Sequence, residues 1–483
     1  MGLWSKLTGL LTAQTSRPSG PSRMQIRERT STHTACLIIG GGHNGLSVAS
    51  GLKRRGIDPI VLEQHPAIGD QWRNRYERLH LHHVTDAMHQ PGVPYPKHVP
   101  RYLSRLDLAD YLDSYAHINN LDVRINHRVQ HLCQNTSGQW VATVERPGEP
   151  SSIEITADEV VLAVGVKGVT PRFPELEGRD QWSGRVLHSM EYHNAEGFEG
   201  QRVLIVGAGN SGVEICCDLY DHGAKPSILI RSPGGFVTRE AFSAYQRLLP
   251  IGGFFLKYVP FSWIVAPIVI AALDQYFLYD VRRRYGDLSS KGVTQDSPPP
   301  MRRMLTTRGE KAPTYVDGTW GDVGVSIFDL IRDDEVPTFG AEISRLEPGS
   351  KTVVFKDGKT AEFDAVVLCT GFLSILAHYA TFVDKALHEK MKKGFRVWEE
   401  VDGIPGLWCS LGSLAGSRYA AQILAGRVAA KIQKRRPPAR ILSGPWAYHL
   451  VGIDPGLVQI PKRTILINAV AGLGLLGYLA GFF

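Results

Sequence analysis

The chain has 483 residues, enough for two or three ordinary domains. Its hydrophobic fraction of 43% and charged fraction of 21% are typical of a globular protein and exclude a disordered chain. The net charge of +7 is mild for this length and comes without a long Lys/Arg run, so no nucleic-acid partner is expected.

The first 33 residues are predicted to be a leader and linker outside the fold. From residue 34 the pattern becomes α/β. ACLIIG is predicted to be a buried strand, GHNGLSVASGLKRRG a helix, and DPIVLEQ a second strand.

Residues 39–45 read IGGGHNG and place a G-x-G-x-x-G pattern between that strand and that helix. In such a turn the first glycine makes the bend, the second admits a pyrophosphate, and the third lets the helix pack on the strand. Glu63 ends the next strand, where a carboxylate suits ribose hydroxyls and repels a 2′-phosphate. The unit therefore predicts an FAD site. Its predicted contacts are Gly40, Gly42, His43, Asn44, Gly45 and Glu63.

A second copy of the pattern, VGAGNSG at 206–212, follows the predicted strand RVLIVG and opens another helix. Arg231, with Ser232 beside it, ends the next strand, and a guanidinium there suits a 2′-phosphate. This unit predicts an NADPH site, with Arg231 as a solvated loop residue the alternative. Its predicted contacts are Gly207, Gly209, Asn210, Ser211, Gly212, Arg231 and Ser232.

Two dinucleotide sites on one chain imply that electrons pass from NADPH to FAD and then to an acceptor. The six cysteines include no C-x-x-C pair, which excludes a dithiol acceptor and also a disulfide framework. Molecular oxygen, a quinone or another protein remain as acceptors.

The segment WSGRVLHSMEY just before the second glycine turn bears on this choice. It fits aromatic-x-G-x-x-x-H-x-x-x-Tyr and resembles the class B flavin-dependent monooxygenases, whose motif is F-x-G-x-x-x-H-x-x-x-[YF]. A Trp replaces the Phe here, and the closing Tyr followed by His193 differs from the Baeyer–Villiger branch. The motif residues are Trp182, Gly184, His188 and Tyr192. We expect His188 and Tyr192 to shape the seam between the two domains.

The resemblance runs from about residue 34 to 433. IGDQW resembles the family's G-G-x-W segment with Asp70 in place of a glycine, and LHLH resembles the YUCCA branch. FDAVVLCTGF and IPGLWCSLG resemble two further family segments. The resemblance implies additional FAD contacts at Gln71, Trp72, His82, Gly371 and Gly412. His82 and His83 match positions over the flavin in liver-type members and are the candidate catalytic residues.

Membership of this family implies an NADPH- and O₂-dependent monooxygenase that inserts one oxygen atom into a small organic substrate through a C4a-hydroperoxyflavin. Two other functions stay open. One is a membrane-associated NAD(P)H:quinone oxidoreductase, and the other is a non-enzymatic flavin- or nucleotide-sensing membrane protein. The histidines near residue 80 have no cysteine partner, so no metal site is expected.

The last 20 residues, 464–483, contain no charge and follow Lys462 and Arg463. A helix of this length spans about 30 Å, enough for a bilayer core. We therefore expect a C-terminal membrane anchor with the catalytic domains facing the cytosol. A hairpin folded onto the enzyme is the alternative. A second apolar run, 258–277, is interrupted by prolines and an aspartate and is a poor membrane span.

The predicted fold is α/β, with two Rossmann-like dinucleotide-binding domains for FAD and NADPH and a C-terminal hydrophobic helix. The oligomeric state is left open. The predicted boundaries are 1–33 for the leader, 34–185 for the first part of the FAD domain, 186–339 for the NADPH domain with an apolar insertion at about 240–285, 340–433 for the second part of the FAD domain, 434–463 for a linker and 464–483 for the anchor.

Overall fold

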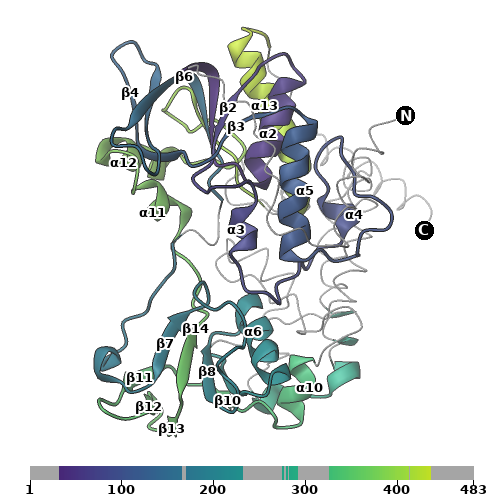
Figure 1. Cartoon of the computed structure of the whole chain (residues 1–483), viewed down its shortest axis with the longest axis vertical. Coiled ribbons are helices and arrows are strands. Elements are labelled where there is room, and N and C mark those ends of the chain that lie inside the picture. Colours follow the sequence, from purple (N-terminus) through teal and green to yellow (C-terminus); the bar gives the residue numbers. More distant parts are fainter. Residues whose placement is uncertain are drawn as a thin grey trace, which may run out of the picture.

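The computed structural model describes residues 32–165, 170–231, 275–276, 279–280, 282–291, 326–412 and 414–436. This part of the chain forms two α/β units stacked along the long axis of the molecule (Figure 1). Each unit contains one of the two glycine turns, and each turn joins a parallel strand to a helix. The predicted α/β class is confirmed.

The first unit holds the larger sheet, in the order β3-β2-β1-β6-β5-β4, with β15 also paired to β6. The strands β1, β2, β3, β6 and β15 are parallel, whereas β4 and β5 are antiparallel. The strands are β1 (His33–Ile39), β2 (Ile60–Leu62), β3 (Asp122–Arg124), β4 (Arg128–Gln134), β5 (Trp140–Glu145), β6 (Ile153–Leu162) and β15 (Leu407–Cys409). The helices are α2 (His43–Lys53), α3 (Asp70–Arg73), α4 (Thr85–Met88), α5 (Arg105–Ile118), α11 (Ile375–Tyr379), α12 (Lys385–Gly394) and α13 (Leu414–Ile432).

The second unit holds a parallel sheet in the order β10-β9-β8-β14-β7, accompanied by a separate antiparallel sheet β11-β12-β13. The strands are β7 (Arg185–His188), β8 (Arg202–Val206), β9 (Lys225–Leu229), β10 (Thr338–Phe339), β11 (Ile343–Leu346), β12 (Thr352–Phe355), β13 (Thr360–Glu362) and β14 (Ala365–Leu368). The helices are α6 (Asn210–Asp221) and α10 (Ile327–Arg332), with 3₁₀ turns η1 (Arg179–Gln181) and η2 (Ser289–Lys291).

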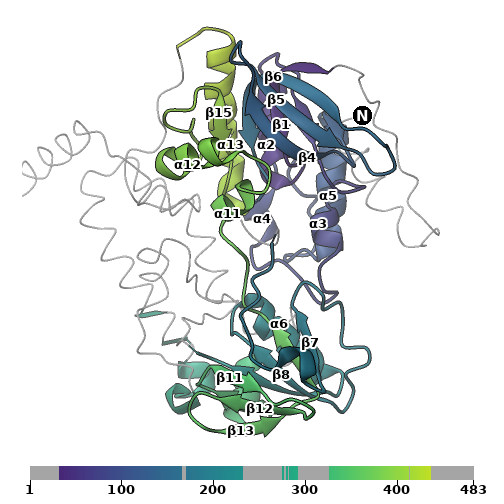
Figure 2. The same cartoon turned by 90° about the vertical axis from the view of Figure 1, so that its left-hand side faces the viewer.

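Both main sheets are buried on two faces, which explains why their parallel strands are continuous apolar runs. In β1, Cys36 and Ile38 join a core shared with α2, α5 and α13. Leu37 and Ile39 point to the opposite face, where α11 and α12 complete a second core. Figure 2 shows α13 beside α2, and in Figure 1 α12 lies away from both. This two-sided packing fixes the strand ends on which the glycine turns stand.

The chain passes between the two units twice, near residues 171 and 372, and these two crossings lie side by side. The backbone N–H of Arg172 donates to the carbonyl oxygen of Gly371 at 3.0 Å, and that of Leu373 donates to Thr170 at 2.9 Å. Pro171 and Phe372 form an antiparallel bridge between the same two strands of chain. The units are therefore joined by a short, paired double crossing.

The crossings correct the two predicted domain boundaries. The predicted boundary at 185/186 would divide strand β7, but the whole strand belongs to the sheet of the second unit. Trp182, placed in the first unit by that boundary, packs in a core of the second unit. The elements β11 to β14, placed after 340 in the second part of the FAD domain, also belong to the second unit, where β14 lies between β7 and β8. The run AVVL fits any buried parallel strand, and its sequence does not say which sheet receives it.

Several predicted segments lie outside the described residues. They are the leader up to residue 31, most of the insertion at 240–285, and everything after 436, including the anchor at 464–483. These stay predictions. In the part of the chain that is described, none of the helices combines the length and apolar character needed to span a bilayer.

Candidate dinucleotide sites

The first glycine turn lies at the carboxyl edge of the first sheet. Gly40 has a φ of +109°, a conformation that favours glycine. A Cβ on Gly45 would lie 1.9 Å from the carbonyl oxygen of Gly40, so no side chain fits there. A Cβ on Gly42 would have no neighbour within 4 Å. The turn is closed on the protein side and open on the side where a ligand would approach.

The second turn repeats this geometry in the other unit. Gly207 also has a φ of +109°, and a Cβ on Gly212 would lie 1.9 Å from the carbonyl oxygen of Gly207. Gly209, like Gly42, has no atom within 4 Å of its Cβ position. The N-cap residues of α2 and α6 are Gly42 and Gly209, which have no side chain with which to cap the helix. Each turn fits a pyrophosphate.

Glu63 lies directly beside the first turn. Its Oε2 accepts a hydrogen bond from the backbone N–H of Gly41 at 2.9 Å, and its Oε1 accepts one from His65 at 2.9 Å. Burial raises the pKa of this carboxyl, and the two N–H donors act against that rise. A carboxylate oxygen accepts more than one hydrogen bond, so capacity for ribose hydroxyls remains.

Arg231 lies at the matching strand end of the second unit, where it is paired with an acid. Its Nη1 is 2.9 Å from Oε1 of Glu342, and Lys356 Nζ is 2.6 Å from the other carboxylate oxygen. The two cations lower the pKa of Glu342, Lys356 contributing more. The Arg231 side chain is 64% exposed, so a phosphate could reach it. Ser232 lies outside the described residues.

The candidate histidines occupy different surroundings. His82 directs Nε2 towards Oε1 of Glu214 on α6, at 3.3 Å, so it contacts the second unit. Desolvation lowers the pKa of His83 to about 4. His43 is buried at the start of α2, with Nε2 3.3 Å from the carbonyl oxygen of Met88, and its pKa is also lowered to about 4 by burial. Their contacts with a flavin stay predictions.

The aromatic-to-Tyr motif lies at the double crossing. His188, at the end of β7, accepts a hydrogen bond from the Met190 N–H on Nδ1 at 3.2 Å and donates from Nε2 to the Gly371 carbonyl oxygen at 3.1 Å. This pattern describes a neutral imidazole, in accord with a pKa that burial lowers. Tyr192 donates its hydroxyl proton to Asp218 of α6 at 2.6 Å.

Trp182 and Gly184 have a packing role in the same motif. A Cβ on Gly184 would lie 2.3 Å from the Trp182 ring, and the indole Nε1 donates to the carbonyl oxygen of Thr352 at 3.2 Å. The buried indole joins the core under β11 to β14. The motif therefore connects the second unit's core to the crossing.

The remaining predicted FAD contacts lie on α3, after β15 and on the crossing between the two units. Gln71 and Trp72 lie on α3, whose N-cap residue is Gly69. A Cβ on Gly69 would lie 2.8 Å from that of Ala109 on α5. Gly412 follows β15 at the carboxyl edge of the first sheet. Gly371 lies on the crossing itself, close to the second turn, because Cys369 contacts Gly207. The structure brings Gly40, Glu63 and Gly412 to one sheet edge.

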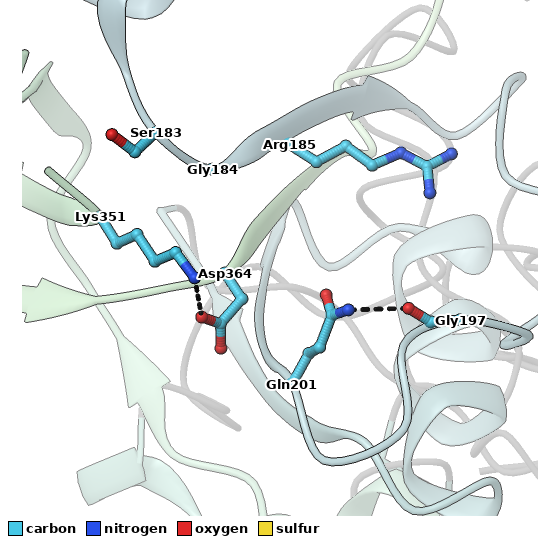
Figure 3. A pocket seen from close by; sticks show the side chains of 7 residues that line it. All are labelled: Ser183, Gly184, Arg185, Gly197, Gln201, Lys351 and Asp364. Atoms are coloured by element: carbon cyan, nitrogen blue, oxygen red, sulfur yellow. Dashed lines mark hydrogen bonds and ion pairs between the residues drawn. The ribbon is translucent and has the colours of Figure 1, made fainter. Parts of the chain in front are cut away.

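A polar cavity of about 440 Å³ opens elsewhere on the second unit (Figure 3). Arg185, Gln201 and Asp364 lie at or just before the amino ends of β7, β8 and β14. Ligands of open α/β sheets bind beyond the carboxyl ends of the strands. This cavity is therefore at the wrong edge for a dinucleotide. Its lining residues are Ser183, Gly184, Arg185, Gly197, Gln201, Lys351 and Asp364.

The sequence interpretation missed a set of polar residues between the units. Tyr76 and Arg78 contact Glu214, Asp218 and Asp221 on α6. The three acids are spaced i, i+4, i+7 on a helix that otherwise reads as apolar, and this spacing could have indicated one buried face. Within the described residues, no group of three His, Cys, Asp or Glu side chains could hold a metal ion.

The chain is similar in sequence to known oxidoreductases. The family described as "Pyridine nucleotide-disulphide oxidoreductase" matches residues 37–245, a range that contains both glycine turns. The Arabidopsis thaliana protein "Probable indole-3-pyruvate monooxygenase YUCCA3" is 32% identical over 343 residues, covering 70% of this chain and 73% of that protein. The "Indole-3-pyruvate monooxygenase YUCCA6" of the same plant is 30% identical over 377 residues, covering 77% and 83%.

Solved structures share the fold at lower sequence identity. A flavin-containing monooxygenase from Stenotrophomonas maltophilia has a TM-score of 0.55 at 20% identity, covering 83% of this chain and 98% of its own. The complex of OTEMO with FAD and NADP has a TM-score of 0.62 at 16% identity, covering 83% and 85%. At these identities the likeness concerns the fold.

Proposed function

The chain belongs to the YUCCA-like family of flavin monooxygenases, and from this we propose that it is an NADPH-dependent enzyme that inserts one oxygen atom of O₂ into a small organic substrate. NADPH supplies two electrons as a hydride, one oxygen atom of O₂ enters the substrate, and the other takes up the hydride-derived hydrogen and a proton and leaves as water. The observation that carries the proposal is the pair of glycine turns with the same geometry and opposite charges at the neighbouring strand ends.

The first unit would hold FAD. The open space at Gly42 and the uncapped N-terminus of α2 would receive the pyrophosphate, and Glu63 would accept hydrogen bonds from the ribose hydroxyls. The hydrogen bonds from Gly41 and His65 hold the Glu63 carboxylate in place before the ligand arrives. When bound, FAD would supply the electron transfer and oxygen activation that amino-acid side chains do not provide.

The second unit would hold NADPH by the same means, at Gly209 and the start of α6. Arg231 would bind the 2′-phosphate together with Ser232. Glu342 now neutralises Arg231, so a bound phosphate would take the place of that carboxylate as its counter-ion. Lys356, which shares Glu342, would then stabilise the released acid.

His82 and His83 would serve as hydrogen-bonding groups near the flavin. With a pKa near 4, His83 is neutral at pH 7 and is able to both donate and accept. His82 approaches Glu214 and so connects the flavin side of the interface to α6. His188 and Tyr192 act further away, where they hold the crossing and the face of α6.

The substrate class is a 2-oxo acid or a molecule with a nucleophilic nitrogen or sulfur. The plant relatives are named for indole-3-pyruvate, which makes a 2-oxo acid the first compound to test. NADPH-dependent product formation with a panel from these three classes tests the assignment. Reduction of a quinone without any oxygenated product supports the quinone oxidoreductase, and tight FAD binding without NADPH consumption supports the sensor.

We also propose that residues 464–483 anchor the enzyme in a membrane with the catalytic units on the cytosolic side. The uncharged run and the basic pair before it support this placement. A deletion of 464–483 should give a protein that leaves the membrane fraction with its FAD and activity intact. A deletion that loses FAD, while the intact protein stays in the soluble fraction, would support a hairpin folded onto the enzyme.

A further inference from the structure

A short segment of the first unit enters the core of the second. We call residues 72–82 the bridging segment. Trp72 and Leu81, near its two ends, pack in the core of the first unit. Tyr76 and Leu79, which lie between those two residues in the sequence, pack in the core of the second unit under α6. The chain thus leaves one core, enters the other and returns within a few residues. In Figure 1, α6 lies on the side of the second unit that faces α3.

The helix that receives the bridging segment presents three acids on one face. Glu214, Asp218 and Asp221 form what we call the acidic stripe of α6. Glu214 is fully buried and Asp218 is 4% exposed. The Asp221 side chain is 24% exposed. Buried carboxylates are costly unless they are paired and hydrogen-bonded, so this stripe depends on its partners.

The bridging segment supplies most of those partners. The Tyr76 hydroxyl donates to Glu214 Oε2 at 2.7 Å. Nη1 of Arg78, whose side chain is 9% exposed, is 2.6 Å from Oδ2 of Asp221 and 3.9 Å from Oδ1 of Asp218. The backbone adds a further link, because the N–H of Glu77 donates to the carbonyl oxygen of His193 at 2.7 Å.

The stripe lies close to the second glycine turn. Glu214 is four residues after Asn210, where α6 begins, so its carboxylate is about one helical turn from the start of the helix. At the other end, the bridging segment continues from Gln71 and Trp72 of α3. A shift of Tyr76 or Arg78 relative to α6 would therefore change the separation of the two proposed dinucleotide sites.

We propose that Tyr76, Arg78 and Glu214 are positioning residues that set the register of the NADPH-binding helix α6 against the flavin side of the interface. The inference rests on the proposed function for its kinetic consequence. Hydride transfer is sensitive to small changes in the distance between donor and acceptor, whereas binding to either glycine turn depends on contacts within one unit. Loss of the link should therefore slow flavin reduction more than it weakens the binding of FAD.

The test uses the full-length protein and the double variant Tyr76→Phe/Arg78→Met, which keeps the apolar bulk of both side chains. We expect the variant to retain FAD. At saturating NADPH in anaerobic stopped flow, its flavin should be reduced about tenfold more slowly than in the parent, as expected for misplaced reactants. Hydrogen exchange of backbone amides in the bridging segment and α6 should be about tenfold faster, because local opening becomes easier.

Matched variants separate positioning from general damage. Glu399→Gln removes an ion pair of 3.2 Å to Arg427 within the first unit and should change neither readout. The side chains of this pair are 17% and 24% exposed, against 9% and 24% for Arg78 and Asp221. The single variant Arg78→Lys keeps a cation at this position and should reduce its flavin at nearly the rate of the parent protein. If the double variant does not bind FAD, Tyr76→Phe alone, which removes one oxygen atom, is measured by the same two methods.

The inference is overturned if the variants exchange hydrogen and reduce flavin as the parent does, or if Glu399→Gln has the same effect. Failure of the proposed function has a different signature. In that case NADPH does not reduce the parent's flavin at all, and the exchange measurement still tests the link between the bridging segment and α6.

Discussion

Gly45 lies directly against Gly40, so that a Cβ on Gly45 would come within 1.9 Å of the Gly40 carbonyl oxygen. The glycine between them, Gly42, has an empty Cβ environment and an ordinary extended backbone with a φ of −81°. Two glycines of one motif thus serve different purposes. Gly45 permits the fold, and Gly42 leaves room for a ligand.

This difference predicts opposite results for two alanine substitutions. Gly45→Ala should destabilise the protein by about 3 kcal/mol or more, because the added methyl group overlaps backbone. Gly42→Ala should leave the free energy of unfolding of the flavin-free protein almost unchanged but weaken FAD binding about 100-fold or more, since the methyl group would occupy the place that we propose for the pyrophosphate. Chemical denaturation and flavin titration measure the two effects.

The second turn provides the matched control. Gly209→Ala should leave FAD binding unchanged and raise the Kd for NADPH, because Gly209 has the same open environment in the other unit. Loss of FAD from Gly209→Ala, or of NADPH binding alone from Gly42→Ala, would contradict the assignment of FAD to the first unit and NADPH to the second.

Cofactor preference should depend on the Arg231–Glu342 pair. Arg231→Ala should raise the KM for NADPH about tenfold or more and leave that for NADH nearly unchanged, since charge-assisted phosphate contacts contribute about 1.5–3 kcal/mol. Glu342→Gln should act in the opposite direction by removing the competing acid. Steady-state kinetics with both cofactors decide the matter, and equal effects of Arg231→Ala on both would show that this residue does not bind the 2′-phosphate.

His188 should hold the double crossing as a neutral imidazole. His188→Ala removes the hydrogen bond to the Gly371 carbonyl oxygen and should destabilise the protein by about 1–3 kcal/mol, the cost of an unsatisfied buried group. Trp182→Phe introduces the family's usual aromatic but loses both the bond to Thr352 and part of the ring packed on Gly184, so it should cost at least about 1 kcal/mol. Denaturant unfolding compares them, and a stable His188→Ala protein would argue against this role.

Acid should destabilise the first unit through His43. Its pKa is lowered from 6.5 to about 4 by burial, so between these values the unfolded chain binds the proton more readily than the folded one. Above pH 6.5 His43 is neutral in both states and does not lower the free energy of unfolding. As the pH falls from 6.5 towards 4, the free energy of unfolding decreases by at most about 1.4 kcal/mol per pH unit. Unfolding of the parent and of His43→Gln across this range should show a shallower slope in the variant. Parallel slopes would contradict the prediction.

Local features of the sequence predicted much of the fold. A glycine spacing specifies a turn because the close contacts of Gly45 and Gly212 arise within a few residues. The placement of β14 was not predictable in this way, since its run AVVL satisfies either sheet. The same limit hid Glu342, which meets Arg231 across 111 residues, and Tyr76, which meets Glu214 across 138. Pairings of this kind depend on the fold as a whole.

The most direct test of the proposed oxygen insertion is to follow isotopically labelled dioxygen. The purified, FAD-loaded protein is supplied with NADPH, labelled O₂ and a substrate such as indole-3-pyruvate, and the product is analysed by mass spectrometry. We predict one labelled oxygen atom per product molecule and one NADPH consumed for each. Product without a labelled oxygen atom, or NADPH consumption that depends on a quinone and leaves every organic compound unlabelled, would contradict it.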